Sequence, residues 1–440
     1  MRIVHLGLGN FFRAHQAWYT SVAPDAGDWP IAAFAGRSPG ASAALNAQHG
    51  QYTLLVRGPS RDEATIISAL DVAYAANDLQ AWRENLAAPR TTVLTLTVTE
   101  AGYLRDAGGG LDESRAAADV SAWLRGEPVR TVPGRLMAGL AERRIHGGGP
   151  IAIVPCDNLP GNGAAVARVL LDFTSLAEPA LVPWIRDNVS FVTTMVDRIT
   201  PSTTGEDVRA AVALTGFDDA VPVVTEPFSE WVLSGAFPGG RPRWEDAGAT
   251  VTDDVVPFEQ RKLWLLNGGH SLLAYAASIR GAGTVAEAVA DDTARLWLEE
   301  WWSEASAHLS LPATDVAAYR DALLDRFANP RMRHRLDQIA ADGSQKLPIR
   351  ILPVLRAERG AGRTPPGATR ALAAWICHLR GLGAPVKDAR AETVVPLADG
   401  PLPDAVRSVL DFLDPAIAAD DALAAAVLAH AEELERQATP

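Results

Sequence analysis

The sequence predicts an α/β protein of two domains: a doubly wound N-terminal domain around a parallel sheet, then a mostly α-helical C-terminal domain. A short apolar segment runs into a glycine pair at the N-terminus, and predicted strands and helices alternate across the first half of the chain. Such alternation is typical of a parallel sheet covered on both faces. Long helical periods replace it after about residue 255, so we place the domains at residues 1–254 and 255–440.

The first predicted strand, residues 2–6, is followed directly by Gly7 and Gly9. Two glycines at this spacing suit a tight turn that brings backbone N–H groups close to a pyrophosphate at a helix N-terminus. A second strand, residues 31–35, follows at the spacing of a dinucleotide-binding domain. Because the third glycine position holds Phe12, the motif alone is equally compatible with a plain structural turn.

The residues after the second strand bear on the choice of dinucleotide. An NAD-selective domain normally offers an acidic side chain there to the adenosine ribose, whereas this chain has Gly36, Arg37 and Ser38. Arg37 and Ser38 suit a 2′-phosphate, and an arginine stacked on adenine without discrimination is equally compatible. We expect NAD as the cofactor, with NADP as the alternative.

Polar residues close three further predicted strands of the first domain. These strands are residues 92–99, 151–154 and 191–198. The polar residues at their ends include Thr99, Glu100, Asn158 and Asp197. Ligands of open α/β sheets bind beyond the carboxyl ends of the strands, so we expect the site there.

Residues 257–275 open the second domain and interrupt an apolar run with polar side chains. Burying such groups without partners is costly, which indicates a function. At about 100° per residue, an α-helix places the polar groups within one arc. They are Glu259, Lys262, Asn267 and His270. This set can remove a proton from an alcohol and hold the oxygen that becomes a carbonyl. We therefore predict a redox site in the cleft between the domains.

The remaining helical periods of the second domain are residues 284–307, 315–327 and 420–435. With 53 acidic against 40 basic residues, the net charge of −13 opposes binding to nucleic acid or anionic membranes. The two cysteines, Cys156 and Cys377, lie far apart and the histidines show no ligand spacing, so we expect no metal. Without an 18-residue apolar run or a secretory segment, we expect a cytoplasmic protein with a small-molecule ligand.

Several segments together resemble the mannitol dehydrogenase family of polyol-specific long-chain dehydrogenases. They are residues 7–16, 95–100, 156–162, 194–201, 226–228 and the Lys-x4-Asn-x2-His pattern of 262–270. The resemblance implies a Rossmann-like N-terminal domain and a helical C-terminal domain. It also implies a zinc-independent, NAD(P)-dependent oxidoreductase acting on CH–OH, as a monomer or weak oligomer.

The resemblance further implies roles for individual residues. Lys262 is the general base, Asn158 and Asn267 hold the substrate oxygen, His270 orients the substrate, Glu259 assists proton exchange with solvent and Asp197 supports the site through hydrogen bonds. We assign cofactor binding to Gly7, Gly9, Asn10, Phe11, Arg13, Arg37, Thr99 and Glu100. Structural alternatives are a surface lysine at 262, a helix cap at Asn158, a pair of Asp197 with Arg198 alone, and a satisfied core histidine at 270.

Residues 326–348 bear on the identity of the substrate, because they look like the substrate-binding segment of the family. Lys346 matches its lysine, and Gln338 stands where mannitol-oxidising members tend to carry arginine. This pattern favours fructuronate reductases, which interconvert D-mannonate and D-fructuronate. A carboxylate substrate requires a cationic partner. The sequence leaves open whether Lys346, Arg335 or another group supplies it.

Two other functions remain as alternatives. A neutral polyol such as mannitol or arabinitol is the runner-up substrate, because Trp264 and Gly269 depart from the family pattern within the catalytic helix. A sugar-binding regulator on the same fold is the non-enzyme alternative. Lys262 with Asn267 and His270 argues against the regulator, since binding alone needs no base.

Overall fold

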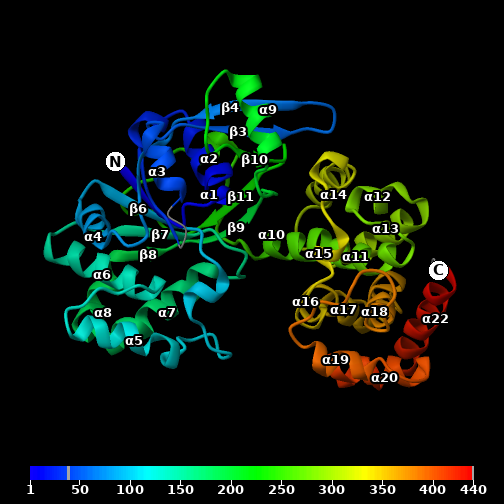
Figure 1. Ribbon diagram of the computed structural model, residues 1–440. Helices are drawn as coiled ribbons and strands as arrows, with labels where there is room; N and C mark the ends of the chain where they lie inside the picture. The colour runs from blue at the N-terminus through cyan, green and yellow to red at the C-terminus, as the bar shows by residue number, and fades with distance from the viewer. Residues whose placement is uncertain (37–39, 439–440) are drawn as a thin grey trace. The chain divides into compact units, whose positions relative to one another are not determined.

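The computed structural model describes residues 1–36 and 40–438. By its internal contacts the chain divides into two compact units, Met1–Val256 and Pro257–Pro440. Unit 1 contains all of the strands that the structure describes, and unit 2 is built of helices (Figure 1). The predicted fold class is confirmed.

Unit 1 is organised around a six-stranded sheet whose pairings are all parallel, in the order β5-β2-β1-β6-β7-β8. Its strands are β1 (Arg2–Leu6), β2 (Ile31–Phe34), β5 (Leu70–Tyr74), β6 (Thr91–Leu96), β7 (Ile151–Pro155) and β8 (Val189–Phe191). If the six strands of this sheet are numbered by their order in the chain, the arrangement is the doubly wound order 3-2-1-4-5-6. The order reverses beside β1, which places the ligand crevice beyond the carboxyl ends of β1 and β6.

Helices cover both faces of this sheet, which explains why β1, β2, β6 and β7 are buried along almost their whole length. Ile3 of β1 packs into one core and the next residue, Val4, into the other. The first core draws on α1 (Asn10–Ala14), α2 (Gln16–Val22) and α3 (Gly40–Ala47). The second draws on α4 (Leu79–Ala87), α5 (Glu113–Leu124), α6 (Val132–Ile145), α7 (Asn162–Ala177) and α8 (Val182–Asn188).

Two small sheets of unit 1 were not predicted. One joins β10 (Val223–Thr225), β3 (Tyr52–Arg57) and β4 (Asp62–Ile67), next to α9 (Gly205–Thr215). The other joins β12 (Thr250–Val251), β11 (Glu230–Ser234) and β9 (Thr193–Asp197).

The prediction of one strand over residues 191–198 is wrong. β8 ends the parallel sheet at Phe191, whereas β9 pairs antiparallel with β11. The side chain of Asn162 accepts from Thr194 N at 2.9 Å and donates to Thr194 O at 3.1 Å. This side chain therefore binds the backbone N–H and C=O of Thr194, which a parallel neighbouring strand would otherwise bind.

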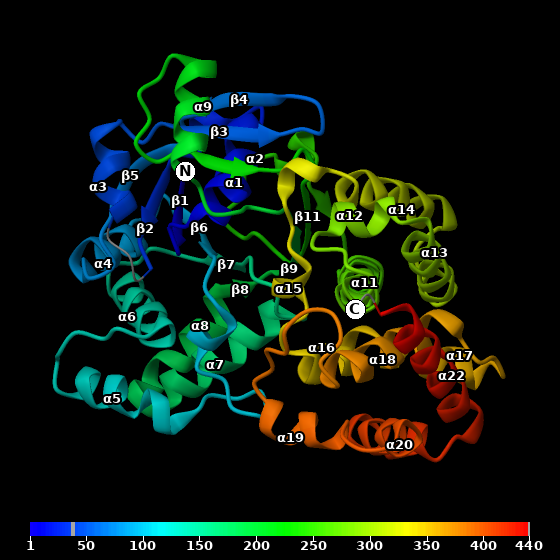
Figure 2. The same cartoon turned by 45° about the vertical axis from the view of Figure 1, so that its right-hand side comes forward.

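Unit 2 is arranged around α11 (Gly269–Ile279), which Figure 2 shows nearly end-on. Its neighbours are α12 (Val285–Ala290), α13 (Asp292–Ser306), α15 (Leu336–Ile339), α16 (Gly343–Arg350), α18 (Pro366–Leu379) and α22 (Asp421–Gln437). The other helices are α10 (Val256–Arg261), α14 (Ala313–Phe327), α17 (Leu352–Gly360), α19 (Ala391–Leu397), α20 (Leu402–Leu413) and α21 (Pro415–Ala418). The residues of α11 are almost all buried, so it forms the core of the unit.

The helix predicted over residues 284–307 is two helices. Asp291 adopts an extended conformation between them, and its side chain accepts from Thr293 N at 2.8 Å and from Ala294 N at 3.0 Å. These bonds cap the N-terminus of α13 and end α12, which a hydrophobic period alone does not reveal.

Candidate active site

The loop after β1 requires glycine at its first position. Gly7 has a φ of 114°, and a Cβ there would lie 2.2 Å from the carbonyl oxygen of Thr97. Thr97 Oγ1 donates to Gly7 O at 2.8 Å and thereby ties the ends of β1 and β6 together. At Gly9 an added Cβ would meet nothing closer than 3.6 Å. Gly7 therefore fixes the turn, whereas Gly9 leaves it uncrowded.

Phe12 occupies the third glycine position because it fills the space between α1 and β1. Its ring stacks on His5 with centroids 3.5 Å apart, and both side chains are buried. The two ring nitrogens of His5 lie 2.8 Å from Thr95 Oγ1 and 3.1 Å from Thr97 Oγ1. Burial lowers the pKa of His5 to about 3, so the imidazole is neutral and structural.

Arg13 lies inside unit 1 and supports the glycine loop. Its guanidinium donates to Val221 O and, at 2.9 Å, to Asn10 Oδ1, and it lies over the ring of Tyr52. These contacts position Asn10. The assignment of Arg13 and Asn10 to cofactor binding stays a prediction, and Arg37 lies outside the described residues.

A pocket of about 520 Å³ opens beyond the carboxyl ends of β6 and β7. It is lined by Phe11, Thr97, Val98, Thr99, Glu100, Ala101, Cys156, Asp157, Asn158 and Val196. Four residues that the sequence assigned to the site therefore share one pocket, namely Phe11, Thr99, Glu100 and Asn158. Its volume lies within the range of small-ligand sites.

Buried polar contacts hold the loop that carries Asn158. Tyr103 donates its hydroxyl to Asp157, and burial raises the pKa of both groups. Asn162 donates to Pro155 O at 3.2 Å. The N-cap of α7 is Gly161, so Asn158 does not cap this helix; its side chain is exposed. Asp157 and Asn162 belong to the motif of 156–162, whereas Tyr103 comes from a distant part of the chain that no motif marks.

Asp197 is buried at the end of β9, opposite Glu230 of β11. The neighbouring Arg198 donates to Ala14 O and to Glu226 O and lies 4.5 Å from the centre of the Trp18 ring. Arg198 thus hydrogen-bonds to backbone carbonyl groups and packs against α2. These contacts disfavour the interpretation that Asp197 only pairs with Arg198.

The stretch that the sequence proposes as catalytic is a continuous helix whose middle part, Lys262–Gly268, is a π-helix between α10 and α11. The predicted uniform α period is therefore wrong here. An α-helix would set Lys262 and Asn267 about 140° apart, whereas i→i+5 bonding stacks residues five apart on one face. Lys262, Asn267 and Glu259 are half-buried. The wider turn places residues 262 and 267 on one face of the helix, and single π-helical turns are frequent at functional sites.

Two tryptophans of α13 contact this π-helix. Trp301 Nε1 donates to Trp264 O at 2.8 Å, and Trp302 Nε1 donates to Leu265 O at 3.0 Å. A Cβ at Gly268 would lie 2.6 Å from the Trp301 ring. The glycines at 268 and 269 thus permit the close approach of α13 that supplies these indole donors.

His270 is buried and stacks on Phe327, with ring centroids 4.5 Å apart, while its edge faces His334. Burial, with the nearby His334, Arg326 and Arg350, holds the pKa of His270 well below its usual value. Among the residues that the structure describes, its Nε2 has no hydrogen-bond partner. His270 is therefore a neutral imidazole with an unused nitrogen, unlike a satisfied core histidine.

Lys346 and Gln338 lie on neighbouring helices of unit 2. Lys346 Nζ donates to Ile339 O at 3.1 Å and to Ala341 O, and burial lowers its pKa. These bonds cap the end of α15, which carries the exposed Gln338. Arg335 is exposed and forms a two-point pair with Asp337.

Arg350 is a functional candidate that the sequence did not reveal. Its Nη1 donates to Asn267 O at 3.3 Å and to Ser271 Oγ at 3.2 Å, so the guanidinium lies against the proposed catalytic helix. Burial lowers the pKa of Arg350 to about 10, which leaves it charged near neutral pH. The only signal in the sequence was its position two residues after the 343–348 motif.

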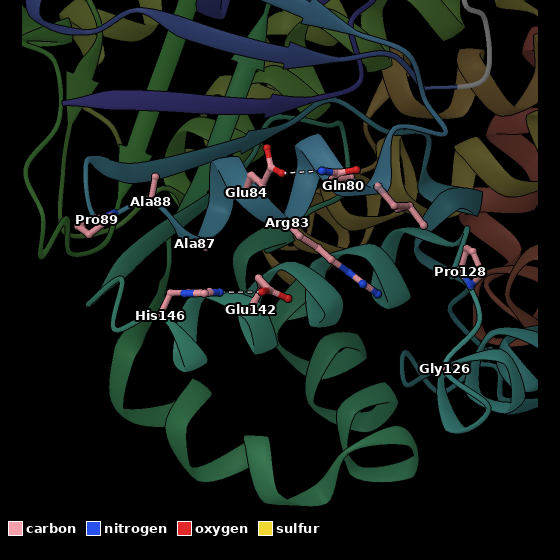
Figure 3. A pocket seen from close by; sticks show the side chains of 11 residues that line it. Gln80, Arg83, Glu84, Ala87, Ala88, Pro89, Gly126, Pro128, Glu142 and His146 are labelled. Atoms are coloured by element: carbon pink, nitrogen blue, oxygen red, sulfur yellow. Dashed lines mark hydrogen bonds and ion pairs between the residues drawn. The ribbon is translucent and has the colours of Figure 1, made fainter.

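A larger pocket, of about 710 Å³, lies on the helices α4 and α6 (Figure 3). Four of its polar side chains form two hydrogen-bonded pairs, Glu142 with His146 and Gln80 with Glu84, both at 2.9 Å. It includes none of the residues assigned to the site and no strand end, so we do not assign it to the reaction.

Two properties of the described residues complete the description. In the part of the chain that the structure covers, no three or more His, Cys, Asp or Glu side chains are grouped to hold a metal ion. Across the same residues, the helices lack either the length or the apolar character that crossing a membrane requires.

Comparison with known proteins covers both units. Residues 1–246 match the mannitol dehydrogenase Rossmann domain, and residues 254–432 match the mannitol dehydrogenase C-terminal domain. The chain is 36% identical over 391 residues to a D-mannonate oxidoreductase of Escherichia coli, covering 87% of this chain and 80% of that protein. It is 39% identical over 383 residues to a D-arabinitol 4-dehydrogenase of Ralstonia nicotianae, covering 84% and 81%.

One similar solved structure is a ternary complex. The Pseudomonas fluorescens mannitol 2-dehydrogenase with NAD and D-mannitol superposes with a TM-score of 0.81 and 32% identity, covering 99% of this chain and 92% of that chain. The sequence motifs and the two-part architecture thus agree with one family over nearly the whole chain.

Proposed function

This chain belongs to the mannitol dehydrogenase family of oxidoreductases acting on CH–OH groups, and we propose that it interconverts D-mannonate and D-fructuronate with NAD(H). The observation that carries the proposal is the π-helical turn Lys262–Gly268, which leads directly into the helix of the buried, neutral His270 and has the Arg350 guanidinium bonded to its backbone. A base, an oxygen-binding amide, an imidazole and a cation are what oxidation of a sugar acid needs.

In the proposed reaction, Lys262 takes the hydroxyl proton of the alcohol and returns it when the ketone is reduced. The side-chain amides of Asn267 and Asn158 hold the substrate oxygen as negative charge develops there. His270 orients the substrate through its unused Nε2, and Glu259 assists proton exchange with solvent. Asp197 supports the site by hydrogen bonding.

The residues of unit 1 fit a dinucleotide. A turn fixed by Gly7, an uncrowded Gly9, and a pocket containing Phe11 and Thr99 lie where the strand order reverses. A nicotinamide dinucleotide, when bound, supplies the hydride acceptor. We propose NAD(H), with NADP(H) as the alternative that Arg37 would favour; the kcat/KM ratio of the two cofactors in wild type and Arg37→Ala decides between them.

Two features favour a sugar acid over a neutral polyol. The segment 343–348 with Gln338 resembles fructuronate reductases, and a D-mannonate oxidoreductase is among the relatives. The runner-up is a neutral polyol, favoured by the slightly higher identity to a D-arabinitol 4-dehydrogenase.

The test is a substrate panel. Purified protein with NADH or NADPH is given D-fructuronate, D-tagaturonate, D-fructose and D-xylulose, and nicotinamide absorbance is followed. The proposal expects the highest kcat/KM with D-fructuronate. Turnover of D-fructose or D-xylulose without D-fructuronate would instead support the neutral polyol. Saturable sugar binding without any turnover would support the regulator.

A further inference from the structure

We propose that Arg350 binds the carboxylate of the sugar acid and so forms the subsite that distinguishes this substrate from a neutral polyol. The inference rests on the proposed function, because it assigns to one side chain the cationic partner that a mannonate-type substrate needs. Arg350 is the last residue of α16, and its guanidinium reaches the catalytic helix.

The hydrogen bonds of Arg350 leave one edge of the guanidinium unused. Nη1 donates to Asn267 O and to Ser271 Oγ, both on the catalytic helix. Nε is buried and, within the described residues, has no hydrogen-bond partner. In an arginine, Nε–H and one Nη2–H point the same way and form the edge that binds a carboxylate through two parallel bonds. Because a buried donor without an acceptor is costly, this edge is suited to a ligand.

The charge of Arg350 also lacks a counter-ion. Among the residues that the structure describes, its hydrogen bonds go to neutral oxygens, and it takes part in no ion pair. Burying an uncompensated cation is unfavourable, and an anionic ligand would relieve the penalty. The guanidinium is also close enough to His270 to lower the pKa of that imidazole.

A second unsatisfied atom lies nearby. His270 Nε2 is buried without a partner, as is Arg350 Nε. Ser271, a hydrogen-bond partner of Arg350, is the next residue after His270 on α11. A ligand bearing both a hydroxyl and a carboxylate would satisfy the two groups together, whereas a neutral polyol would leave the arginine edge without a charged partner.

The two cations that the sequence named as partners for the carboxylate, Lys346 and Arg335, are engaged elsewhere. Lys346 caps the end of α15 through Ile339 O and Ala341 O. The guanidinium of Arg335 is exposed and forms its two-point pair with Asp337. Of the three, Arg350 is the one with an unused donor edge, so we assign the carboxylate to it.

The test compares D-fructuronate with D-fructose, which differ in a carboxylate against a hydroxymethyl group at one end. Steady-state reduction by NADH is measured for wild type, Arg350→Met and Arg350→Lys. We expect Arg350→Met to lower kcat/KM for D-fructuronate about 100-fold more than for D-fructose, mainly through KM, because a buried charge pair loses one partner. Arg350→Lys keeps the charge without the two-point edge and should recover part of the loss.

The matched control is Arg356→Met, which removes an exposed arginine of unit 2 that binds Asp414. It should leave the ratio of the two substrates at the wild-type value. Equal losses on both substrates in Arg350→Met would overturn the inference and reduce Arg350 to a positioning residue for Asn267.

A binding measurement separates failure of this inference from failure of the proposed function. Calorimetric titration of D-mannonate into the protein with NADH reports binding without turnover. Wild-type binding that weakens about 100-fold in Arg350→Met supports the subsite even if D-fructuronate is a poor substrate. Unchanged binding in a folded Arg350→Met protein contradicts it, even if D-fructuronate proves to be the substrate.

Discussion

Lysine is scarce in this chain: only Lys262, Lys346 and Lys387 occur among 40 basic residues. Arginine therefore serves almost every surface and structural role of a cation. Since a guanidinium is not deprotonated in proteins, a lysine is required where a cation must release its proton. This contrast supports Lys262 as the base, whereas Lys346 has structural bonds and Lys387 is exposed.

Replacement of Lys262 by methionine removes the proposed base and keeps the aliphatic stem. We expect kcat for hydride transfer to fall by about 10² to 10⁴-fold, the usual contribution of a general base. NADH affinity, measured by fluorescence titration, should stay near that of wild type because the glycine loop lies in unit 1. Lys387→Met is the control for loss of a lysine. Wild-type turnover in Lys262→Met would remove this lysine from the mechanism.

His5 links stability to pH. Its pKa is lowered by burial to about 3 from an ordinary 6.5, so below pH 6.5 the unfolded chain binds a proton that the folded one does not. Stability from this group is complete above pH 6.5 and is lost as pH falls, by about 1.4 kcal/mol per unit until the folded pKa is reached.

The melting temperature of His5→Gln between pH 7.5 and 4.5 tests this linkage. Glutamine keeps hydrogen-bonding capacity toward Thr95 and Thr97 and does not titrate. We expect a shallower fall than in wild type, even though the variant is less stable at pH 7.5. Parallel curves for the two proteins would show that the linkage lies in other groups.

At the scale of elements, the π-helix is the feature that most distinguishes the observed helix of the proposed site from the uniform α-helix that the sequence predicts. The sequence predicted the polar side chains of the proposed site and the helix on which they lie, but not the local period of that helix. Within this turn, Trp264 O and Leu265 O accept from the indole N–H groups of Trp301 and Trp302, which come from a helix more than thirty residues away in the chain. A local pattern cannot reveal such a contact.

Gly268→Ala tests whether this packing maintains the turn. The new methyl group would lie 2.6 Å from the Trp301 ring, which forces α13 away from the π-helix. We expect a loss of about 1–3 kcal/mol in unfolding free energy, typical of overpacking. We also expect a lower kcat, because Asn267 shifts with its neighbour.

Gly360→Ala is the matched control, because nothing lies within 4 Å of a Cβ at that position. It should change the unfolding free energy by less than about 0.5 kcal/mol. If Gly268→Ala behaves like this control in both stability and kcat, the contact with Trp301 does not maintain the turn.

At the scale of the whole molecule, the proposed chemistry is divided between the units. The glycine loop, the strand-end pocket and Asn158 belong to unit 1, and Lys262, Asn267 and His270 belong to unit 2. The prediction that the site lies in a cleft between the domains stays a prediction. Because the residues proposed for the two tasks belong to different units, we expect nucleotide binding to be separable from ketose reduction.

A fragment of residues 1–256 tests this separation. It contains the whole parallel sheet and both of its cores, so we expect it to fold and to bind NADH but to reduce no ketose. Circular dichroism reports folding, and quenching of tryptophan fluorescence reports binding. The same fragment with Gly9→Val should fold and bind NADH weakly. A folded wild-type fragment without NADH affinity would mean that unit 2 completes the cofactor site.

The sequence by itself determined the strands around the glycine loop and the change to helices near residue 255. It also supplied the candidates for the reactive side chains, which stay a prediction. Hydrophobic periods and glycine turns are local properties, so they can be read along the chain. Only the tertiary structure decided the π-helical turn, the split of residues 191–198 into two sheets, and the place of Arg350. Each of these depends on a hydrogen bond to a distant partner: Trp301 to Trp264, Asn162 to Thr194, and Arg350 to Asn267.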